Sequence, residues 1–179
     1  NAMALELTGD APEFLDPFNG LQDLSKKVLR TPGRPGDSFN DDPLRMMRAA
    51  RFASQLDFEI DPDVLVSIKD LADRITIVSA ERVRDEFIKI LMSPDPRVGI
   101  TILVDTGLAD IVIPEIPKLR LEVDEHHHHK DVYEHSITVL EQAMVQEARL
   151  GGPNLIIRLA ALLHDIGKPK TRSFIDGGG

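Results

Sequence analysis

The chain has 179 residues, of which 42% are apolar and 28% are charged, and its net charge is −9. This composition is typical of a folded protein and excludes disordered and collagen-like chains. The sequence contains no cysteine, which excludes disulfide bonds, thiolate metal sites and cysteine catalysis. No apolar run is long enough for a membrane span, so we expect no membrane partner and a cytoplasmic protein.

Helix signals dominate the chain and predict a mainly α fold. Two Asp-Pro pairs predict helix starts, because aspartate caps a helix and proline suits its first turn. With apolar periodicity and Pro or Gly breaks, the expected helices are 43–56, 62–72, 80–93, 96–107, 131–149 and 154–164. The remaining signals are a strand at 3–7, a turn at 16–20 and a non-helical connection at 113–117.

The two ends of the sequence predict a fragment of a longer protein. The chain begins with Asn1-Ala2-Met3 and ends with three glycines shortly after a histidine motif. We therefore expect that residues needed for a complete activity lie outside this chain.

Basic residues gather in one segment of an acidic chain. Residues 21–55 hold seven basic and four acidic side chains, which gives this segment a net charge of +3. Such an island favours a phosphate-bearing partner. A solvated charged face is the alternative.

Arg45, Arg48 and Arg51 recur every three residues on an otherwise apolar helix that follows Asp42. Guanidinium groups on a helix that packs on several sides need anionic partners, and phosphate suits their planar fork. Asp42 accepts hydrogen bonds and Arg45 donates them, so the pair could match the edge of a nucleobase. The alternative is a set of structural ion pairs with nearby carboxylates: Asp41, Glu81 or Glu86.

This arginine segment resembles the nucleotide-selecting motif of bacterial class II tRNA nucleotidyltransferases, the CCA-adding enzymes and their poly(A) polymerase relatives. The matching residues are 40–52, from Asn40-Asp41-Asp42-Pro43-Leu44-Arg45 to Phe52. Residues 16–24 are similar to the family's hinge motif, residues 1–4 to the tail of its ribose-recognising motif, and residues 81–87 to its last neck motif.

The resemblance implies a role for each matching residue. Asp42 and Arg45 would select the incoming base, and Arg48 and Arg51 would hold the nucleotide by its phosphates. The hinge would be shaped by Asp16, Gly20 and Asp23, and the neck helices would be braced by Glu81 and Arg82.

The family's catalytic head, with its Gly-Ser loop and an Asp-x-Asp pair for Mg²⁺, has no counterpart in this sequence. We therefore expect no catalytic residue in this chain and no nucleotide transfer by the chain alone.

A second constellation lies in the last third of the sequence. The motif Leu162-Leu163-His164-Asp165 and the upstream His135 resemble the HD phosphohydrolase superfamily. The resemblance implies that His135, His164 and Asp165 bind a divalent metal, with Lys168 as a possible phosphate contact. A hydrogen-bonded His-Asp pair without metal is the alternative. The run His126–His129 is expected to be a solvated polar loop.

Together these resemblances imply three parts: the tail of the head and the hinge at 1–24, a helical neck at 25–115, and the first part of an all-α HD domain at 116–179. The expected protein adds C, A or both to the 3′ end of tRNA from CTP and ATP. CCA addition, A addition and poly(A) synthesis stay open. The other hypotheses are an HD phosphohydrolase with a nucleotide-binding regulatory region, and a non-catalytic RNA-binding helical module.

Overall fold

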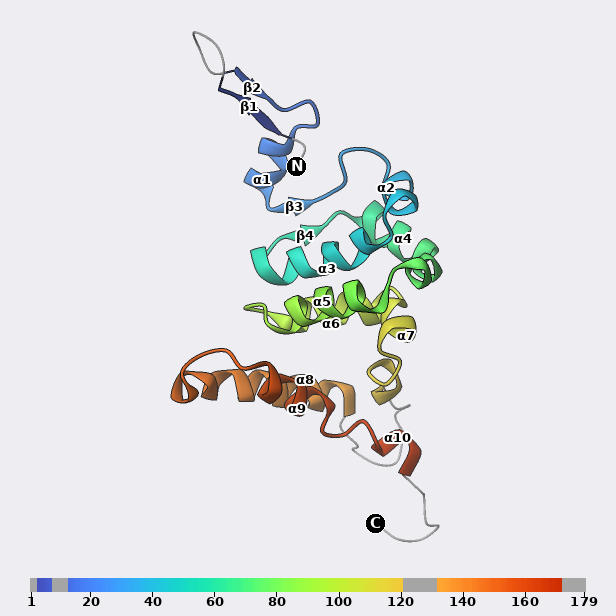
Figure 1. Ribbon diagram of the computed structural model, residues 1–179, viewed down its shortest axis with the longest axis vertical. Helices are drawn as coiled ribbons and strands as arrows, with labels where there is room; N and C mark the ends of the chain where they lie inside the picture. The colour runs from blue at the N-terminus through green and yellow to red at the C-terminus, as the bar shows by residue number, and fades with distance from the viewer. Residues whose placement is uncertain (1–2, 8–12, 121–131, 172–179) are drawn as a thin grey trace. The chain divides into compact units, whose positions relative to one another are not determined.

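The computed structural model describes residues 3–7, 13–120 and 132–171 (Figure 1). It divides the chain into two compact units, Asn1–Leu108 and Ala109–Gly179. The described residues are mainly helical, which confirms the expected fold class. No described helix combines the length and the apolar character that crossing a membrane requires. The histidine run 126–129 lies outside the described residues.

Unit 1 begins with a short β-hairpin and continues mainly through helices. Its elements are β1 (Ala4–Glu6), β2 (Glu13–Leu15), α1 (Gly20–Lys26), β3 (Val28–Leu29), α2 (Pro35–Asp41), α3 (Leu44–Leu56), β4 (Glu59–Ile60), α4 (Pro62–Leu71), the 3₁₀ helix η1 (Ala72–Ile77), α5 (Ala80–Leu91) and α6 (Pro96–Asp105). β1 pairs with β2 in antiparallel fashion, and β3 pairs with β4 in parallel.

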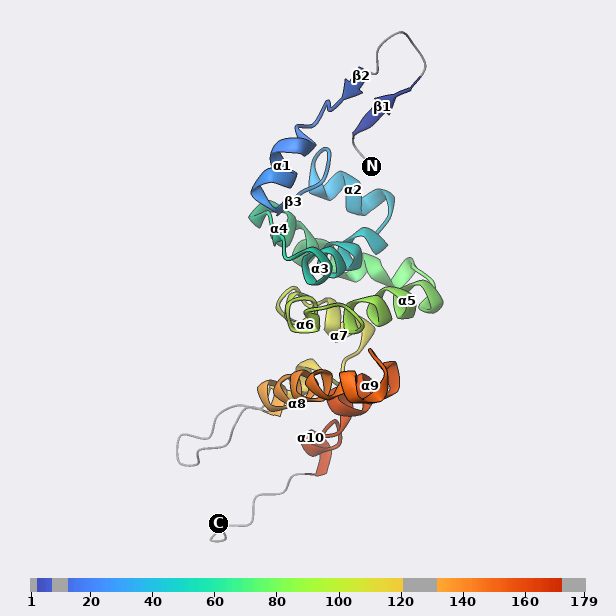
Figure 2. The same cartoon turned by 90° about the vertical axis from the view of Figure 1, so that its left-hand side faces the viewer.

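The core of unit 1 forms around α3, which packs against both α5 and α6 (Figures 1 and 2). Met46, Met47 and Ala50 of α3 have no exposed surface. Because so much of this helix is buried, its arginines lie along the part that remains accessible or faces α5. The close approach of α6 depends on Gly99, where a Cβ atom would meet Ser54 Oγ and lie 2.6 Å from Ile90 Cγ2.

Both helices expected after an Asp-Pro pair are present, and one of them begins a residue later than expected. Asp61 caps α4 by accepting a hydrogen bond from the Asp63 amide at 3.0 Å. The helix after Asp42 begins at Leu44 rather than Pro43, and Asp42 Oδ1 accepts from the Leu44 amide at 3.2 Å. The carboxylate of Asp42 is therefore held at the start of α3.

Two short helices in unit 1 have no clear sequence signal. α1 is seven residues long and contains no buried residue. α2 is equally short and begins without a side-chain cap, but it buries Phe39, which is 1% exposed, and packs on α4. Tertiary contacts, rather than local propensity, therefore stabilise α2.

Unit 2 is built mainly from two packed helices, α8 and α9. The described elements from its boundary onward are α7 (Leu108–Val112), the 3₁₀ helix η2 (Pro117–Leu119), α8 (Val132–Gln146), the 3₁₀ helix η3 (Glu147–Leu150), α9 (Leu155–Leu163) and α10 (Lys168–Thr171). Asn154 caps α9 as expected, accepting hydrogen bonds from the amides of Ile156 and Ile157. The helix expected to run to residue 149 ends at Gln146 and continues as η3.

Candidate nucleotide-binding site and candidate metal centre

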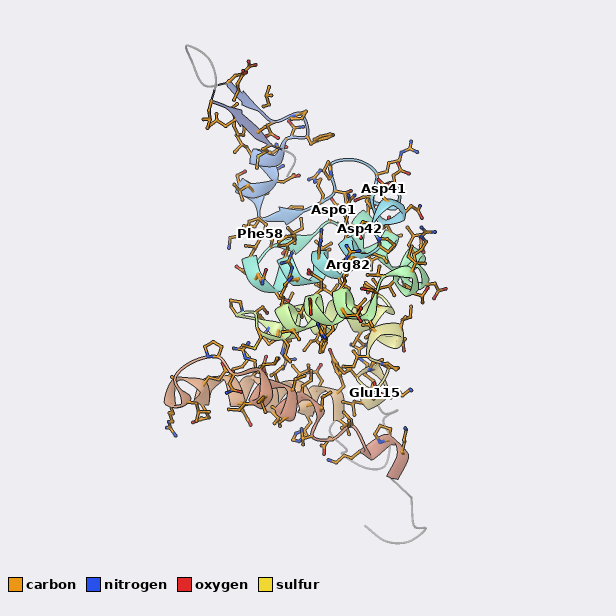
Figure 3. The ribbon with its side chains drawn as sticks, in the orientation of Figure 1. Asp41, Asp42, Phe58, Asp61, Arg82 and Glu115 are labelled. Atoms are coloured by element: carbon orange, nitrogen blue, oxygen red, sulfur yellow. The ribbon has the colours of Figure 1, made fainter. Side chains whose placement is uncertain are left out.

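Asp42 lies at the junction of α2 and α3, where both of its carboxylate oxygens have partners. Oδ1 accepts from the Leu44 amide at 3.2 Å. Oδ2 lies 3.5 Å from Arg82 Nη2 of α5 and 4.0 Å from Arg48 Nη1 of α3. The side chain keeps 24% of its surface exposed, so a ligand can still reach it. Asp42 and Arg82 lie close together in Figure 3.

Arg45 is exposed, one helical turn from Asp42. Its Nη1 donates to the Ser38 backbone carbonyl at 3.3 Å and to the Ser38 hydroxyl at 3.0 Å. A guanidinium carries five N–H donors in a fixed fork, so these two contacts leave further donors for a ligand. Arg45, the expected donor, is thus held by Ser38 of α2, and Asp42, the expected acceptor, directly follows α2 in the chain.

Arg48 and Arg51 both face Glu86 of α5. Arg51 Nε lies 2.9 Å from Glu86 Oε2, and Arg48 Nε lies 4.0 Å from Glu86 Oε1. Arg48 is 41% exposed, whereas Arg51 is 17% exposed. The Arg51 guanidinium also lies over the Phe52 ring at 4.3 Å. Arg48 is therefore accessible to a ligand, and Arg51 is largely paired within the protein.

The contact between Arg51 and Glu86 is an ion pair without hydrogen-bond geometry. Arg51 Nε and Glu86 Oε2 are both buried, and neither has a hydrogen-bond partner. Lys89 Nζ adds a third cation beside this carboxylate, 3.1 Å from Oε1. Glu86 thus receives positive charge from three side chains.

We use the name arginine cluster for seven side chains on α3, on α5 and at the junction of α2 and α3: Asp42, Arg45, Arg48, Arg51, Arg82, Glu86 and Lys89. Five are cations and two are carboxylates, so the cluster carries a surplus of three positive charges. A surplus of guanidinium groups beside an accessible acceptor is suited to an anionic ligand that also carries hydrogen-bond donors.

Two of the three expected hinge residues, Asp16 and Gly20, contact each other at the start of α1. Asp16 accepts from the Gly20 amide at 2.6 Å and from the Leu21 amide at 2.9 Å, so it caps the helix. Asp23 pairs with Arg30 Nη2 at 3.1 Å, and Arg30 Nε lies 3.9 Å from Asp61 at the start of α4. The segment expected to be the hinge is therefore linked to the start of α4 through Arg30.

Glu81 and Arg82, the expected neck braces, have different surroundings. The pKa of the Glu81 carboxyl lies below its usual value because the group accepts hydrogen bonds from its own backbone amide and from the Ser79 hydroxyl. Glu81 thus interacts locally at the start of α5, whereas Arg82 reaches Asp42.

In unit 2, the structure brings His135, His164 and Asp165 together. Their candidate ligand atoms all lie within 4.8 Å of one another. Asp165 Oδ2 is 3.1 Å from His164 Nε2 and 3.8 Å from His135 Nε2. His164 Nδ1 lies 2.8 Å from the Ala161 carbonyl, which orients the ring and leaves Nε2 for a metal.

Asp165 has the protonation state that a metal ligand needs. Burial raises its pKa, but the hydrogen bond from Lys168 and the charges of His164, Lys168 and His135 outweigh burial and hold the pKa below its usual value. Lys168 Nζ lies 2.6 Å from Oδ2 and occupies part of the space in front of the carboxylate. Two imidazoles and one carboxylate fit a divalent transition metal.

Comparison with known proteins assigns two segments of the chain to families. Residues 57–119 match a family described as "Probable RNA and SrmB- binding site of polymerase A", and residues 132–177 match the HD domain. The chain is 38% identical to the "A-adding tRNA nucleotidyltransferase" of Deinococcus radiodurans over 176 residues, which cover 96% of this chain and 39% of that protein.

The chain belongs to the class II tRNA nucleotidyltransferase family. It is also 35% identical to the "Multifunctional CCA protein" of Hahella chejuensis over 178 residues, covering 96% of this chain and 40% of that protein. The solved structure of the Bacillus stearothermophilus CCA-adding enzyme in complex with CTP is 29% identical, covers 90% of this chain and 40% of that chain, and gives a TM-score of 0.60. The chain thus spans about two fifths of the length of these relatives.

The family and the HD match both point to dependence on a divalent metal. In unit 2 the residues that could hold one are His135, His164 and Asp165.

A cavity of about 470 Å³ in unit 1 lies away from the arginine cluster. Its lining residues are Lys26, Lys27, Ala53, Asp57, Phe58, Glu59, Val98 and Ile102. None of the expected nucleotide-binding residues lines this cavity. The charges around α3, rather than the cavity, therefore mark the candidate nucleotide site.

The structure adds three residues whose contacts the sequence did not identify. Ser38 positions Arg45, Arg30 links Asp23 of α1 to Asp61 at the start of α4, and Arg82 reaches Asp42. The sequence indicates Glu86 only as an alternative ion-pair partner of the arginines. Its burial could be predicted from the sequence, because Glu86 lies between Val83 and Ile90 on the apolar face of α5. A buried carboxylate needs a cationic partner.

Proposed function

We propose that this chain is the neck and the first part of the HD domain of a tRNA 3′-end nucleotidyltransferase. The whole protein would add C, A or both from CTP and ATP to tRNA, with Mg²⁺-dependent catalysis in a head outside this chain. Membership of the family supports this proposal, as do the names of the relatives. The single observation that carries it is that an acceptor, Asp42, and an exposed donor, Arg45, both lie at the start of α3, each held by a neighbouring group of the protein.

The chemistry of the bases explains why this pair favours C and A. Cytosine and adenine each present an exocyclic amino group beside an acceptor ring nitrogen, whereas uracil and guanine present a carbonyl oxygen beside a ring N–H. A carboxylate accepts from the amino group and a guanidinium donates to the ring nitrogen. Asp42 and Arg45 therefore suit both substrates and oppose the other two bases.

Arg48 and Arg51 would both interact with the phosphates, but Arg48 would make the main contact. Arg48 is half exposed and reaches its protein partners at 4.0 Å, so phosphate can bind it directly. Arg51 is 17% exposed and its Nε lies 2.9 Å from Glu86 Oε2, so a phosphate would compete with this carboxylate for Arg51. We propose Arg48 as the principal phosphate contact and Arg51 as a contributor to the positive potential.

The test is nucleotide addition to tRNA by a longer protein that carries this chain behind its catalytic head. Arg45→Ala should lower the preference for CTP and ATP over UTP and GTP by about tenfold or more, because the donor to the ring nitrogen is lost. The tRNA affinity should stay unchanged. Intact rate and selectivity would contradict the role of Arg45. Binding of tRNA that survives both Asp42→Ala and Arg45→Ala, without any nucleotide addition by the parent protein, would favour a non-catalytic RNA-binding module.

A second activity, hydrolysis of phosphate esters by the HD domain, is favoured by the cluster of His135, His164 and Asp165. A divalent metal bound there would supply charge to polarise a phosphate and activate water. The residues of this chain would hold it: the two imidazoles through Nε2 and the ionised carboxylate through Oδ2. Lys168, now paired with Asp165, would be free to contact a phosphate when the metal takes that oxygen.

Calorimetric titration with Mn²⁺ tests this centre. The chain should bind the ion, and His164→Ala should weaken binding by at least about tenfold because one of three ligands is lost. Alanine replacement of His126–His129 is the matched control, since it removes histidines from a separate run. If the control abolishes binding and His164→Ala leaves it intact, the proposed centre is wrong.

A further inference from the structure

The carboxylate of Asp42 is held from two elements that lie far apart in sequence. Oδ1 faces the Leu44 amide at the start of α3, at 3.2 Å. Oδ2 lies 3.5 Å from Arg82 Nη2, which reaches across from the first turn of α5. One oxygen of the carboxylate thus meets the first residue of α3, and the other meets a side chain of α5.

This arrangement matters because an aspartate carboxylate rotates easily about its last bond. That torsion has a broad distribution with no strong preference of its own. An acceptor can distinguish an amino group from a carbonyl oxygen only if its lone pairs keep one direction toward the base. The partners of Asp42 therefore set how well it discriminates, even if they never touch the nucleotide.

Of the partners of Oδ2, Arg82 is the closer, because Arg48 Nη1 lies 4.0 Å away. Arg48 also faces Glu86, so it is shared between two carboxylates. Glu81, beside Arg82 in sequence, interacts with Ser79 instead. The side chain of Arg82 is 52% exposed, so its contact with Asp42 does not serve to fill the core.

We propose that Arg82 is a positioning residue that sets base selectivity by fixing the carboxylate of Asp42. This inference rests on the proposed function, because it assumes that Asp42 accepts from the base. The inference predicts that Arg82 affects nucleotide choice. A residue that only braces the neck helices would not have this effect.

The experiment measures kcat and KM for all four nucleoside triphosphates with the longer protein, together with its Kd for tRNA. Arg82→Ala should reduce the preference for CTP and ATP over UTP and GTP by about tenfold. Arg82→Lys keeps the charge without the planar fork and should recover part of the preference. Arg84→Ala is the matched control: Arg84 lies on the same helix, is exposed, and pairs with Asp85 at 2.8 Å. It should leave selectivity unchanged.

A double variant tests whether Arg82 acts through Asp42. In an Asp42→Ala background, Arg82→Ala should cause no further loss of selectivity, since residues that act as a unit are not additive. An equal further loss would show that Arg82 acts separately and would overturn the inference.

Two other results would also overturn it. In one, Arg82→Ala lowers thermal stability or weakens tRNA binding but leaves the preference among the four nucleotides intact. Arg82 would then be a brace of the neck helices or an RNA contact. In the other, Asp42→Ala leaves the preference intact. The second result removes the proposed function as well, whereas the first removes only the role of Arg82.

Discussion

Glu147 and Arg158 form a buried ion pair that joins η3 to α9. Arg158 Nε donates to Oε1 and Nη2 donates to Oε2, both at 2.7 Å, and the Asn154 amide donates to Oε1 at 3.0 Å. The two residues are 5% and 3% exposed. Removing one partner leaves an unpaired buried charge, which makes such pairs costly to break.

We predict that Glu147→Ala destabilises unit 2 by about 3–5 kcal/mol. Hydrogen exchange of the α8 and α9 amides measures this loss separately from unit 1. The double variant Glu147→Met with Arg158→Leu should recover much of the stability, because apolar side chains of similar volume replace both charges. A loss below about 1 kcal/mol for the single variant, as for an exposed pair, would contradict the account.

The same carboxylate makes unit 2 sensitive to acid. The hydrogen bond from Arg158 lowers the pKa of Glu147, although burial opposes it, so the folded pKa lies below the usual value of 4.5. The unfolded chain therefore takes up the proton first, and this contribution to stability is lost as the pH falls below 4.5. Protection of α9 amides should fall in that range, and Glu147→Gln should flatten the dependence.

At the scale of elements, the packing of α6 on α3 depends on a missing side chain. Gly99→Ala would place a Cβ against Ser54 Oγ, at 2.6 Å from Ile90 Cγ2 and at 3.2 Å from the Ala50 carbonyl. Because one of these neighbours is backbone, α6 must shift, and we predict a destabilisation of about 1–3 kcal/mol.

Gly36→Ala in α2 is the matched control, since a Cβ there meets nothing within 4 Å. This variant should be neutral or should stabilise by up to about 1 kcal/mol, because alanine favours a helix more than glycine does. Thermal unfolding of unit 1, followed by circular dichroism, compares the two. Equal effects of both substitutions would contradict the close helix contact.

The elements that could be predicted from the sequence are those with strong local signals. Asp61-Pro62 and Asn154 place the starts of α4 and α9, and the observed caps agree. α1 and α2 could not be predicted, because single contacts rather than local helix propensity stabilise them. Asp16 caps α1 from outside the helix, and α2 depends on the buried side chain of Phe39. Neither contact leaves a periodic pattern in a seven-residue segment.

At the scale of the whole molecule, motif order identified the family. The sequence offered Glu86 as one of three possible ion-pair partners of the arginines, but it did not show which carboxylate each arginine meets. Asp42 and Arg82 are separated by several elements, and so are Arg51 and Glu86. Which cation meets which carboxylate depends on how α3 and α5 pack, and sequence spacing does not encode this. A chain with a net charge of −9 nevertheless gathers a local positive surplus beside α3.

The central claim is that Asp42 accepts a hydrogen bond from the amino group of the incoming base. Its most direct test is the nucleotide preference of Asp42→Asn in the longer protein, measured as kcat/KM with each of the four triphosphates. An asparagine amide both donates and accepts, so it can also serve the carbonyl oxygens of uracil and guanine. We predict that the preference for CTP and ATP falls by about tenfold or more. An unchanged preference, at an unchanged tRNA affinity, would contradict the account.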